Sequence, residues 1–451
     1  MRIASGQGFW GDLQNAPFDQ VTKGPIDYIM MDFLAEVTMS ILQKQKRRDP
    51  KFGYAKDVVE LVEKILPTCV EKGIKVITNG GGVNPVACSE AILKVAHKLG
   101  LNKVKVGIVL GDDILDRIDK LAAEGIELSN METGEKVDSI RHHLQSANVY
   151  FGAAPIVDAL RQGADIVVTG RTTDTGLTLA PMVYEFGWSL SDWDKLAAGT
   201  VAGHILECGG QSSGGNFCAD WESVPDLAHI GFPIAEAYPN GEVVITKHDG
   251  TGGLVSVQTV KEQLLYEIGN PKEYITPDCI ADFTSIHLEQ AGKDRVRVFG
   301  VKGKEATEFY KVSMSYLDGY TAFSTLTFSW PNAYEKAKKA DEILQRRLAD
   351  LHLKLEEYRG EYLGYNSSHD GIANVPSDPS EVVLRIGVRS HDHASVVRFG
   401  KEIAPLILTG PPSVTGFAGG RPKPSEVVSY WPALIPKSAV APSVVIKEMH
   451  G

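Results

Sequence analysis

The first two hundred residues alternate short apolar runs with segments of helical periodicity, and this alternation constrains the fold more than any other feature. The apolar runs predict strands and the segments between them predict helices. Strands separated by helices pair in parallel, with helices on both sheet faces. The predicted strands are 2–5, 28–32, 75–78, 105–110 and 165–169, and the predicted helices are 33–46, 55–72, 85–99, 113–123 and 154–162. The N-terminal half is therefore predicted to be α/β, with a parallel Rossmann-like sheet.

The second half of the chain has a different pattern. Glycines and turn signals dominate residues 201–280. Beyond them, strand-like runs are interrupted by a long predicted helix at 333–355 and a second near 395–408, an order typical of an α+β domain. We therefore predict an α/β domain over 1–280, with a glycine-rich insert at 201–280, and an α+β domain over 281–451.

Charge, cysteine content and hydropathy exclude several classes of partner. The formal net charge of -11 argues against nucleic acid, which is bound by clustered Lys and Arg. Five cysteines without a CxxC spacing indicate free thiols in a reducing compartment. There is no signal-peptide pattern at the start, and no apolar run reaches the roughly 18 residues of a membrane helix. We expect a cytoplasmic homo-oligomer that contacts neither nucleic acid nor membrane.

The segments that follow the predicted strands locate the binding site, because parallel sheets bind ligands beyond the carboxyl ends of their strands. All five segments are rich in glycine, acidic residues or both. They are GQGFWGD at 6–12, MDFLAE at 31–36, NGGGVNP at 79–85, GDD at 111–113 and GRTTDTG at 170–176. In the first of them, a glycine turn brings Trp10 and Asp12 to the mouth of the predicted site.

The segment NGGGVNP predicts an anion-binding turn. Gly80, Gly81 and Gly82 permit a tight turn and close backbone approach to a ligand. Asn84 suits the N-cap of the following helix and Pro85 its first position. A helix N-terminus placed there attracts phosphate or carboxylate. The alternative is an ordinary strand-to-helix turn, which favours the same residues.

Candidate catalytic groups follow two further strands. Arg171 suits a carboxylate or phosphate of the substrate, and Asp174 suits a general base. Asp113 is a second candidate acid–base group. The alternative for Arg171 and Asp174 is an ion pair that only orders their loop.

The sequence leaves the cofactor undefined. Asp112 and Asp113 together with Asp12 or Asp32 are a possible Mg²⁺ ligand set, but no spacing requires one. The run GQGFWG at 6–11 formally matches the dinucleotide-binding pattern, with Asp32 about twenty residues further on. Its two bulky aromatic residues, and the lack of a full helix after it, argue against NAD(P).

A helix is predicted over 192–208, where apolar residues recur at helical spacing and Gly209 suits the position after the end. His204 and Cys208 continue its buried stripe. The helix dipole favours the imidazolium of His204 and disfavours the thiolate of Cys208. We predict His204 as an acid–base candidate, with the GGQSSGG loop at 209–215 as a wall of the site. Glu207 is a further ligand-contacting candidate. The alternatives are structural packing of His204 in the core and a zinc site, which needs two further ligands.

Longer blocks of sequence resemble one family over nearly the whole chain. They are DFLAEVTMSIL (32–42), ITNGGGVNP (77–85), DIVVTGRTTDTGLTLAP (165–181), LAAGTVAGHILECGGQSSGGNF (196–217), GTGGLVSVQTVKEQLLYEIGNP (250–271), RIGVRSHDHASVVRFGKEIAPL (385–406) and GPPSVTGFAGGRPKPSEVVSYWPAL (410–434). The chain resembles the acyclic terpene utilisation protein A family. Larger members carry a small C-terminal domain that this chain is expected to lack. GGQSSGG stands where relatives more often read GAQVTGG.

The resemblance implies a role in the catabolism of citronellol and geraniol, which runs on branched acyl-CoA thioesters, and assigns no catalytic residue. From the residues, we predict an enzyme acting on an acyl-CoA thioester or related carboxylate by hydration, elimination or hydrolysis. Asp174, Asp113 and His204 are the predicted catalytic residues. The alternatives are a non-catalytic accessory protein that binds acyl-CoA or a carboxylase, and a nicotinamide-dependent oxidoreductase.

Overall fold

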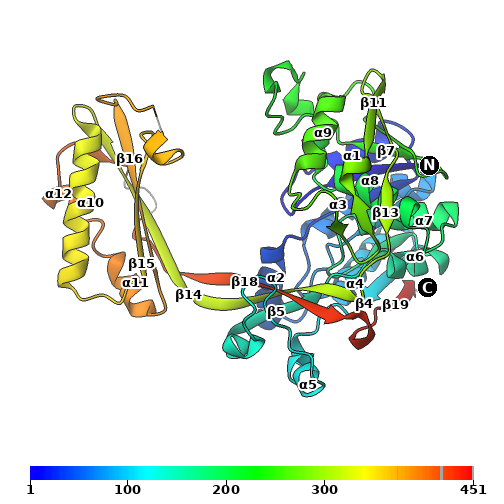
Figure 1. The fold of residues 1–451 in the computed structure, drawn as a ribbon, viewed down its shortest axis with the longest axis horizontal. Helices are drawn as coiled ribbons and strands as arrows, with labels where there is room; N and C mark the ends of the chain where they lie inside the picture. Colours follow the sequence, from blue (N-terminus) through cyan, green and yellow to red (C-terminus); the bar gives the residue numbers. More distant parts are fainter. Residues whose placement is uncertain (373, 417–419, 449–451) are drawn as a thin grey trace. The chain divides into compact units, whose positions relative to one another are not determined.

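The computed structural model describes residues 1–372, 374–416 and 420–448. The fold is mixed α/β and divides into two compact units (Figure 1). Unit 1 comprises Met1–Ser315 and the segment from Tyr430, and unit 2 comprises Tyr316–Ser429. No helix in the described part of the chain is long and apolar enough to cross a membrane.

Unit 1 is built on a ten-stranded mixed sheet. Its central strands, from β1 to β4 in the order below, run parallel to one another, and its outer strands pair antiparallel. The order is β11 (His287–Gly292), β12 (Arg295–Phe299), β8 (Val243–Thr246), β7 (Ile234–Ala237), β1 (Arg2–Gln7), β2 (Tyr28–Met31), β3 (Lys75–Thr78), β6 (Ile166–Val168), β4 (Lys105–Leu110) and β19 (Ser443–Glu448).

Helices cover both faces of the parallel strands. The helices of unit 1 are α1 (Ala16–Thr22), α2 (Glu36–Arg48), α3 (Asp57–Lys72), α4 (Pro85–Lys98), α5 (Ile118–Ala123), α6 (Ala154–Arg161), α7 (Gly176–Phe186), α8 (Trp193–Leu206) and α9 (Val257–Leu265). Successive strand residues point to opposite faces. In β2, Ile29 and Met31 join a buried cluster with α1, α2, α3 and α4, whereas Tyr28 and Met30 join a second one with α6, α7 and α8.

The five predicted strands are all present, and the predicted helices differ mainly at their ends. The helix predicted from residue 33 begins at Glu36, because Asn79 and Asp32 hold the amides of Phe33 and Leu34 in an extended turn. The prediction for 113–123 was too long. Asp113 instead bridges to Asn148, and a single 3-10 turn leads into α5.

Two short elements and one buried helix were not predicted. The helix α1 has only seven residues, and β5 (Leu144–Val149) is a strand of six. The helix α7 is buried along most of its length, so its sequence lacks the polar face that gives helical periodicity. The predicted glycine-rich insert contains β7, β8 and α9.

Residues beyond 280 extend unit 1. A small sheet of β13 (Lys302–Lys304), β10 (Ile280–Asp282) and β9 (Tyr274–Ile275) packs on α8, and the hairpin β11–β12 adds to the large sheet. The compact units therefore divide after Ser315, whereas the sequence suggested residue 280. Sheet pairing that no local pattern reveals holds residues 281–315 in unit 1.

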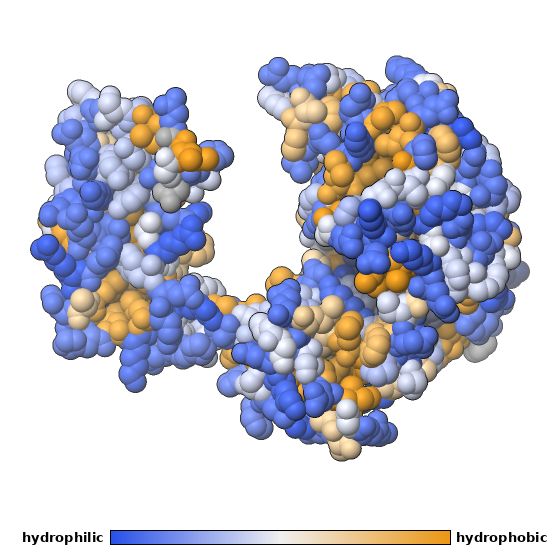
Figure 2. Space-filling view, in the orientation of Figure 1, coloured by the Kyte–Doolittle hydropathy of each residue, from blue (hydrophilic) through white to orange (hydrophobic). Residues whose placement is uncertain are grey.

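Unit 2 is an antiparallel sheet with helices packed against it. The 21-residue strand β14 (Phe309–Ser329) pairs with β16 (Glu381–Ser390) from Tyr320 to Ser329. The other elements are β15 (Glu357–Leu363), β17 (Val414–Thr415), α10 (Ala333–Asp350), α11 (His393–Phe399) and α12 (Leu406–Thr409), and β18 (Ser425–Pro436) pairs with β14. One buried cluster joins the sheet to α10 and α11, and hydrophilic residues cover the outer surface of α10 (Figure 2).

Candidate functional site

The carboxyl ends of the parallel strands bring five loops to one edge of the sheet, and four of these loops contribute polar side chains. Gly8 follows β1, Asp32 follows β2, Asn79 follows β3, Arg171 follows β6 and Asp112 follows β4. The four side chains among them are buried, each no more than 5% exposed. Buried polar groups require partners, and the hydrogen bonds at this edge define the candidate site.

Arg171 is fixed by a dense set of hydrogen bonds. Its Nη1 atom donates to Asp174 Oδ1 and to the carbonyl of Leu34, both at 2.8 Å. Its Nη2 atom donates to Asp174 Oδ2 at 3.3 Å and to the hydroxyl of Tyr150 at 3.0 Å. The backbone amide of Arg171 donates to Asp112. The guanidinium fork thus holds the Asp174 carboxylate, and the ion pair considered from the sequence is present.

Asp32 lies in the same buried cluster. Its Oδ1 atom accepts hydrogen bonds from Asn79 Nδ2 at 2.6 Å and from the amide of Leu34 at 3.1 Å. Burial raises the pKa of Asp32 to about 6, although the charge of Arg171 and the hydrogen bond from Asn79 lower it. A carboxyl group with this pKa holds and releases a proton near neutral pH.

Asp174 and Asp32 titrate as an interacting pair. Burial raises the pKa of Asp174 against the lowering effect of Arg171, and the charges of Asp32 and Glu207 raise it further. One guanidinium therefore serves several carboxyl groups, and the cluster retains a proton at a pH where an isolated aspartate is ionised. The side chain of Asp174 is 31% exposed, so it is the member that reaches solvent.

His204 joins the cluster through Glu207. Its Nδ1 atom lies 2.8 Å from Glu207 Oε1, and its Nε2 atom lies 2.9 Å from the carbonyl oxygen of Gln263. Burial by itself lowers the pKa of His204, but Glu207 and the Gln263 carbonyl raise it above its usual value. With an acceptor at each ring nitrogen, the imidazolium is the favoured form. The second Glu207 oxygen is buried and has no hydrogen-bond partner among the described residues.

The glycine loop after α8 closes one side of the cluster. Gly209 has a φ of +56°, and a Cβ there would lie 2.8 Å from Asp12 Oδ2. Ser212 and Ser213 are fully buried, and their hydroxyls lack hydrogen-bond partners within the described part of the chain. Cys208 is half-buried, and burial raises its pKa to about 12, so its thiol is a poor nucleophile.

Tyr150 and Glu36 form the opposite side. The Arg171 guanidinium carbon lies 4.2 Å from the centre of the Tyr150 ring, and the Tyr150 hydroxyl donates to Glu36 at 3.1 Å. Glu36 in turn lies 4.0 Å from the ammonium of Lys311. Through the Tyr150 hydroxyl and ring, these contacts help to orient Arg171.

The predicted anion-binding turn is a buried connection in the structure. Asn84 caps α4 by accepting from the amide of Ala87, as expected, and its Nδ2 atom donates to the carbonyls of Pro50 and Phe52. Gly80, Gly81 and Gly82 are buried. The amides of Gly80, Gly82, Val83 and Asn84 are each hydrogen bonded within the protein. In this conformation the four amides bind acceptors within the protein.

Asp12 lies beside the glycine loop, whereas Trp10 of the same β1 loop packs on the core. Asp12 accepts from the amides of Gly8 and Leu13, at 2.9 and 2.7 Å, and burial raises its pKa. A Cβ on Gly8 would lie 2.7 Å from the backbone of Cys208, so only glycine permits this approach. Trp10 is half-buried and packs against the core of unit 1.

Asp112 and Asp113 diverge. Asp112 points inward to Arg171 and Asn148, and burial raises its pKa to about 7. The side chain of Asp113 is 31% exposed and lies 3.8 Å from the ammonium of Lys46. No group of three or more His, Cys, Asp or Glu placed to hold a metal ion occurs in the described ranges.

Sequence reasoning missed two members of the cluster, Asn79 and Tyr150. Asn79 directly follows β3, so the rule that located Asp32 and Arg171 also applies to it. Tyr150 follows β5, a strand that was not predicted. The sequence therefore contained a signal for Asn79 but none for Tyr150.

Fold and site together define a mixed α/β protein that buries ionisable side chains at the carboxyl edge of a parallel sheet. The chain belongs to the acyclic terpene utilisation family, because the model described as acyclic terpene utilisation family protein AtuA matches residues 1–446. This confirms the resemblance stated from the sequence. No curated protein and no solved structure gives a significant match.

Proposed function

We propose that this protein is a catabolic enzyme that performs acid–base chemistry on an acyl-CoA thioester or related carboxylate, by hydration, elimination or hydrolysis. The observation that supports it is the ion pair of the partly exposed Asp174 with the buried Arg171, in a cluster that also buries Asp32. Burial raises the pKa of both carboxyl groups. Hydration and elimination need one group that takes up a proton and another that donates it. The family description supports a role in acyclic terpene utilisation.

Asp174 is the proposed proton-transfer group, because it is the carboxylate that Arg171 holds directly and its side chain is partly exposed. Asp32 is fully enclosed and sets the proton affinity of Asp174 through their electrostatic interaction. Arg171 holds Asp174 in position. His204 is proposed to act indirectly. It is hydrogen bonded to Glu207, and the charge of Glu207 raises the pKa of Asp174. The parallel strands thus act as a Rossmann-like support for a site at their carboxyl ends.

The cysteines and the proposed substrate class suggest where in the cell the protein works. All five cysteines are free thiols, which fits a reducing compartment, and acyl-CoA thioesters are soluble intracellular metabolites. We therefore propose that the protein works in the cytoplasm. Trp10 and Asp12 are proposed to contact the substrate from the β1 loop, where Gly8 and Asp12 approach the glycine loop.

The test is turnover of branched 2-enoyl-CoA and 3-hydroxyacyl-CoA thioesters, followed by mass spectrometry with the wild-type protein, Asp174→Asn and the exposed control Asp249→Asn. We expect the wild type and the control to convert substrate and Asp174→Asn to be inactive. Binding of acyl-CoA without turnover by any of the three proteins identifies an accessory protein instead. A response to NAD(P) alone identifies an oxidoreductase.

A further inference from the structure

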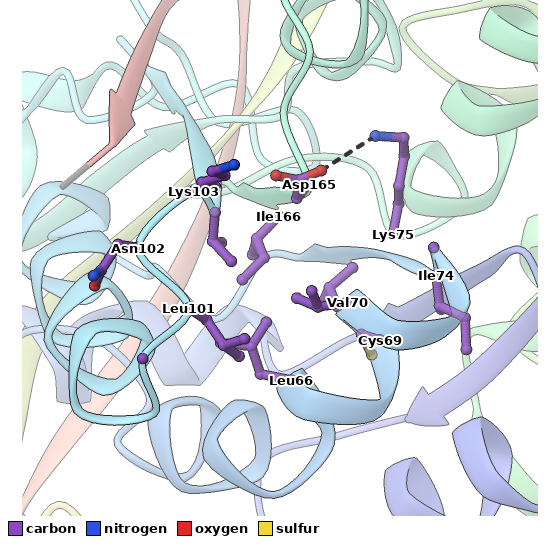
Figure 3. A pocket seen from close by; sticks show the side chains of 14 residues that line it. Leu66, Cys69, Val70, Ile74, Lys75, Leu101, Asn102, Lys103, Asp165 and Ile166 are labelled. Atoms are coloured by element: carbon purple, nitrogen blue, oxygen red, sulfur yellow. Dashed lines mark ion pairs between the residues drawn. The ribbon is translucent and has the colours of Figure 1, made fainter. Parts of the chain in front are cut away.

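A cavity lies at the opposite edge of the parallel strands from the candidate site. Its volume is about 510 Å³, within the range of small-molecule sites. It is enclosed where α3 and α4 end and where β3, β6 and β4 begin (Figure 3). The candidate site lies at the carboxyl ends of the same strands, so the two sites share the sheet but no residues.

The interior of this cavity is apolar. Its buried lining residues, each no more than 4% exposed, are Leu66, Cys69, Ile74, Val76, Val104 and Ile166. Burial raises the pKa of the Cys69 thiol to about 12, so this side chain is a neutral lining group. Val70 is 46% exposed and also lines the cavity. A lining of this composition binds an aliphatic body by removing its apolar surface from water.

The charges at the mouth compensate one another. Lys75 Nζ lies 3.7 Å from Asp165 Oδ1 and donates to the carbonyl of Ala164 at 2.9 Å; Figure 3 shows this ion pair beside the apolar side chains. Lys103 is exposed and keeps its ammonium in water. The C-terminal ends of α3 and α4 also meet this cavity. Each contributes a partial charge of about −0.5, which together offset one cation.

We propose that this cavity binds a neutral, aliphatic small molecule with one hydrogen-bonding head group, such as a medium-chain alcohol. The aliphatic body fills the apolar interior, and the head group stays at the mouth among Lys75, Asp165 and the C-terminal ends of the two helices. A carboxylate head faces the negative helix ends, and an ammonium head faces the two lysines. A charged head group would give up part of its hydration on entering the mouth. It would gain no unpaired opposite charge there in return.

The first test compares octan-1-ol, octanoate and octylammonium by isothermal titration calorimetry on the full chain. We expect octan-1-ol to bind about tenfold more tightly than either ion, a difference of about 1.4 kcal/mol. Tightest binding of octanoate, together with its loss in Lys103→Ala, overturns the proposal in favour of an anion site. Absence of binding by all three ligands also overturns it.

Two variants test whether the ligand binds in this cavity. Val70→Trp introduces a large side chain at an exposed lining position, so octan-1-ol binding should weaken about tenfold or more. Lys64→Trp introduces the same side chain at an exposed position of α3 that does not line the cavity, and it should leave binding unchanged. Thermal melts of both variants verify folding. Equal binding by both folded variants contradicts this location, whatever the outcome for the proposed function.

Discussion

Arg171 and Asp174 form a two-pronged ion pair whose halves differ in exposure, 2% for the arginine side chain and 31% for the aspartate. Both guanidinium Nη atoms reach the carboxylate, at 2.8 and 3.3 Å. The buried half fixes the position, while the partly exposed half is free to meet a substrate. Arg171 is therefore the structural half of the ion pair, and Asp174 is the half available for chemistry.

Arg171→Ala should destabilise the protein by about 3–5 kcal/mol, because it leaves buried carboxylates without their counter-charge. The measurement is the free energy of unfolding in urea. Arg141→Ala is the matched control: it removes a surface arginine that pairs with Asp119, and it should leave stability nearly unchanged because exposed ion pairs contribute little. Equal stability of both variants would mean that the ion pair contributes little to the fold.

Asp32→Asn should change how stability depends on pH. The pKa of Asp32 rises from 3.8 to about 6 on folding, so between these values the folded state binds more protons than the unfolded state. Stability from this group therefore falls as pH rises through that window and stays lower above it. The asparagine variant stays neutral and should be more stable than the wild type above pH 6, with the difference vanishing below 3.8.

The pH experiment has a surface control. Asp249→Asn changes an exposed carboxylate and should leave the pH profile of unfolding unchanged. Thermal melts between pH 3.5 and 8 compare both variants with the wild type. A parallel shift of the Asp32→Asn curve at every pH would show that the substitution acts through packing.

Tyr150→Phe should cost about 0.5–1.5 kcal/mol, because it removes the hydroxyl that joins Arg171 to Glu36. It should also lower kcat in the acyl-CoA assay by releasing Arg171 on one side. Tyr310→Phe removes a hydroxyl from a ring packed edge-on against Phe151 at 5.4 Å. It serves as the control and should change neither quantity. Identical effects of the two variants would argue against a positioning role for Tyr150.

Gly203→Ala should destabilise the loop that carries Asp174. A Cβ at Gly203 would lie 2.5 Å from the carbonyl oxygen of Thr175, the residue after Asp174. The backbone there must move, at a cost of about 1–3 kcal/mol. Gly199→Ala in the same helix meets the flexible end of Leu179 at 2.4 Å, so it should cost less. Unfolding free energies and kcat of the two variants test this ranking.

The sheet edge was predictable because the positions of the strands and the content of the loops after them are local signals. Five apolar runs located the parallel strands, and the residues after them proved to be Asp32, Arg171 and Asp112 of the buried cluster. Tyr150 was not predictable in this way. Its strand pairs with β14, a partner more than a hundred residues away, and pairing over such distances leaves no periodic trace in the sequence.

The glycine turn at 80–82 shows a second limit of prediction from sequence. Its sequence suits both an anion site and a packed turn, because both need glycine. The structure adds a fact that only tertiary contacts provide, namely that residues 50–55 cover the turn and bond to it. Likewise, the helix at His204 was predictable, but the packing of Glu207 near Asp174 was not.

The last strand of the sheet has a consequence for synthesis of the chain. β19 pairs with β4 over six residue pairs, and all of residues 111–442 lie between the two strands. On the ribosome, the outer edge of β4 therefore remains unpaired until unit 2 has been made. An open strand edge recruits other chains, so nascent molecules should be most prone to aggregate in the interval before β19 emerges.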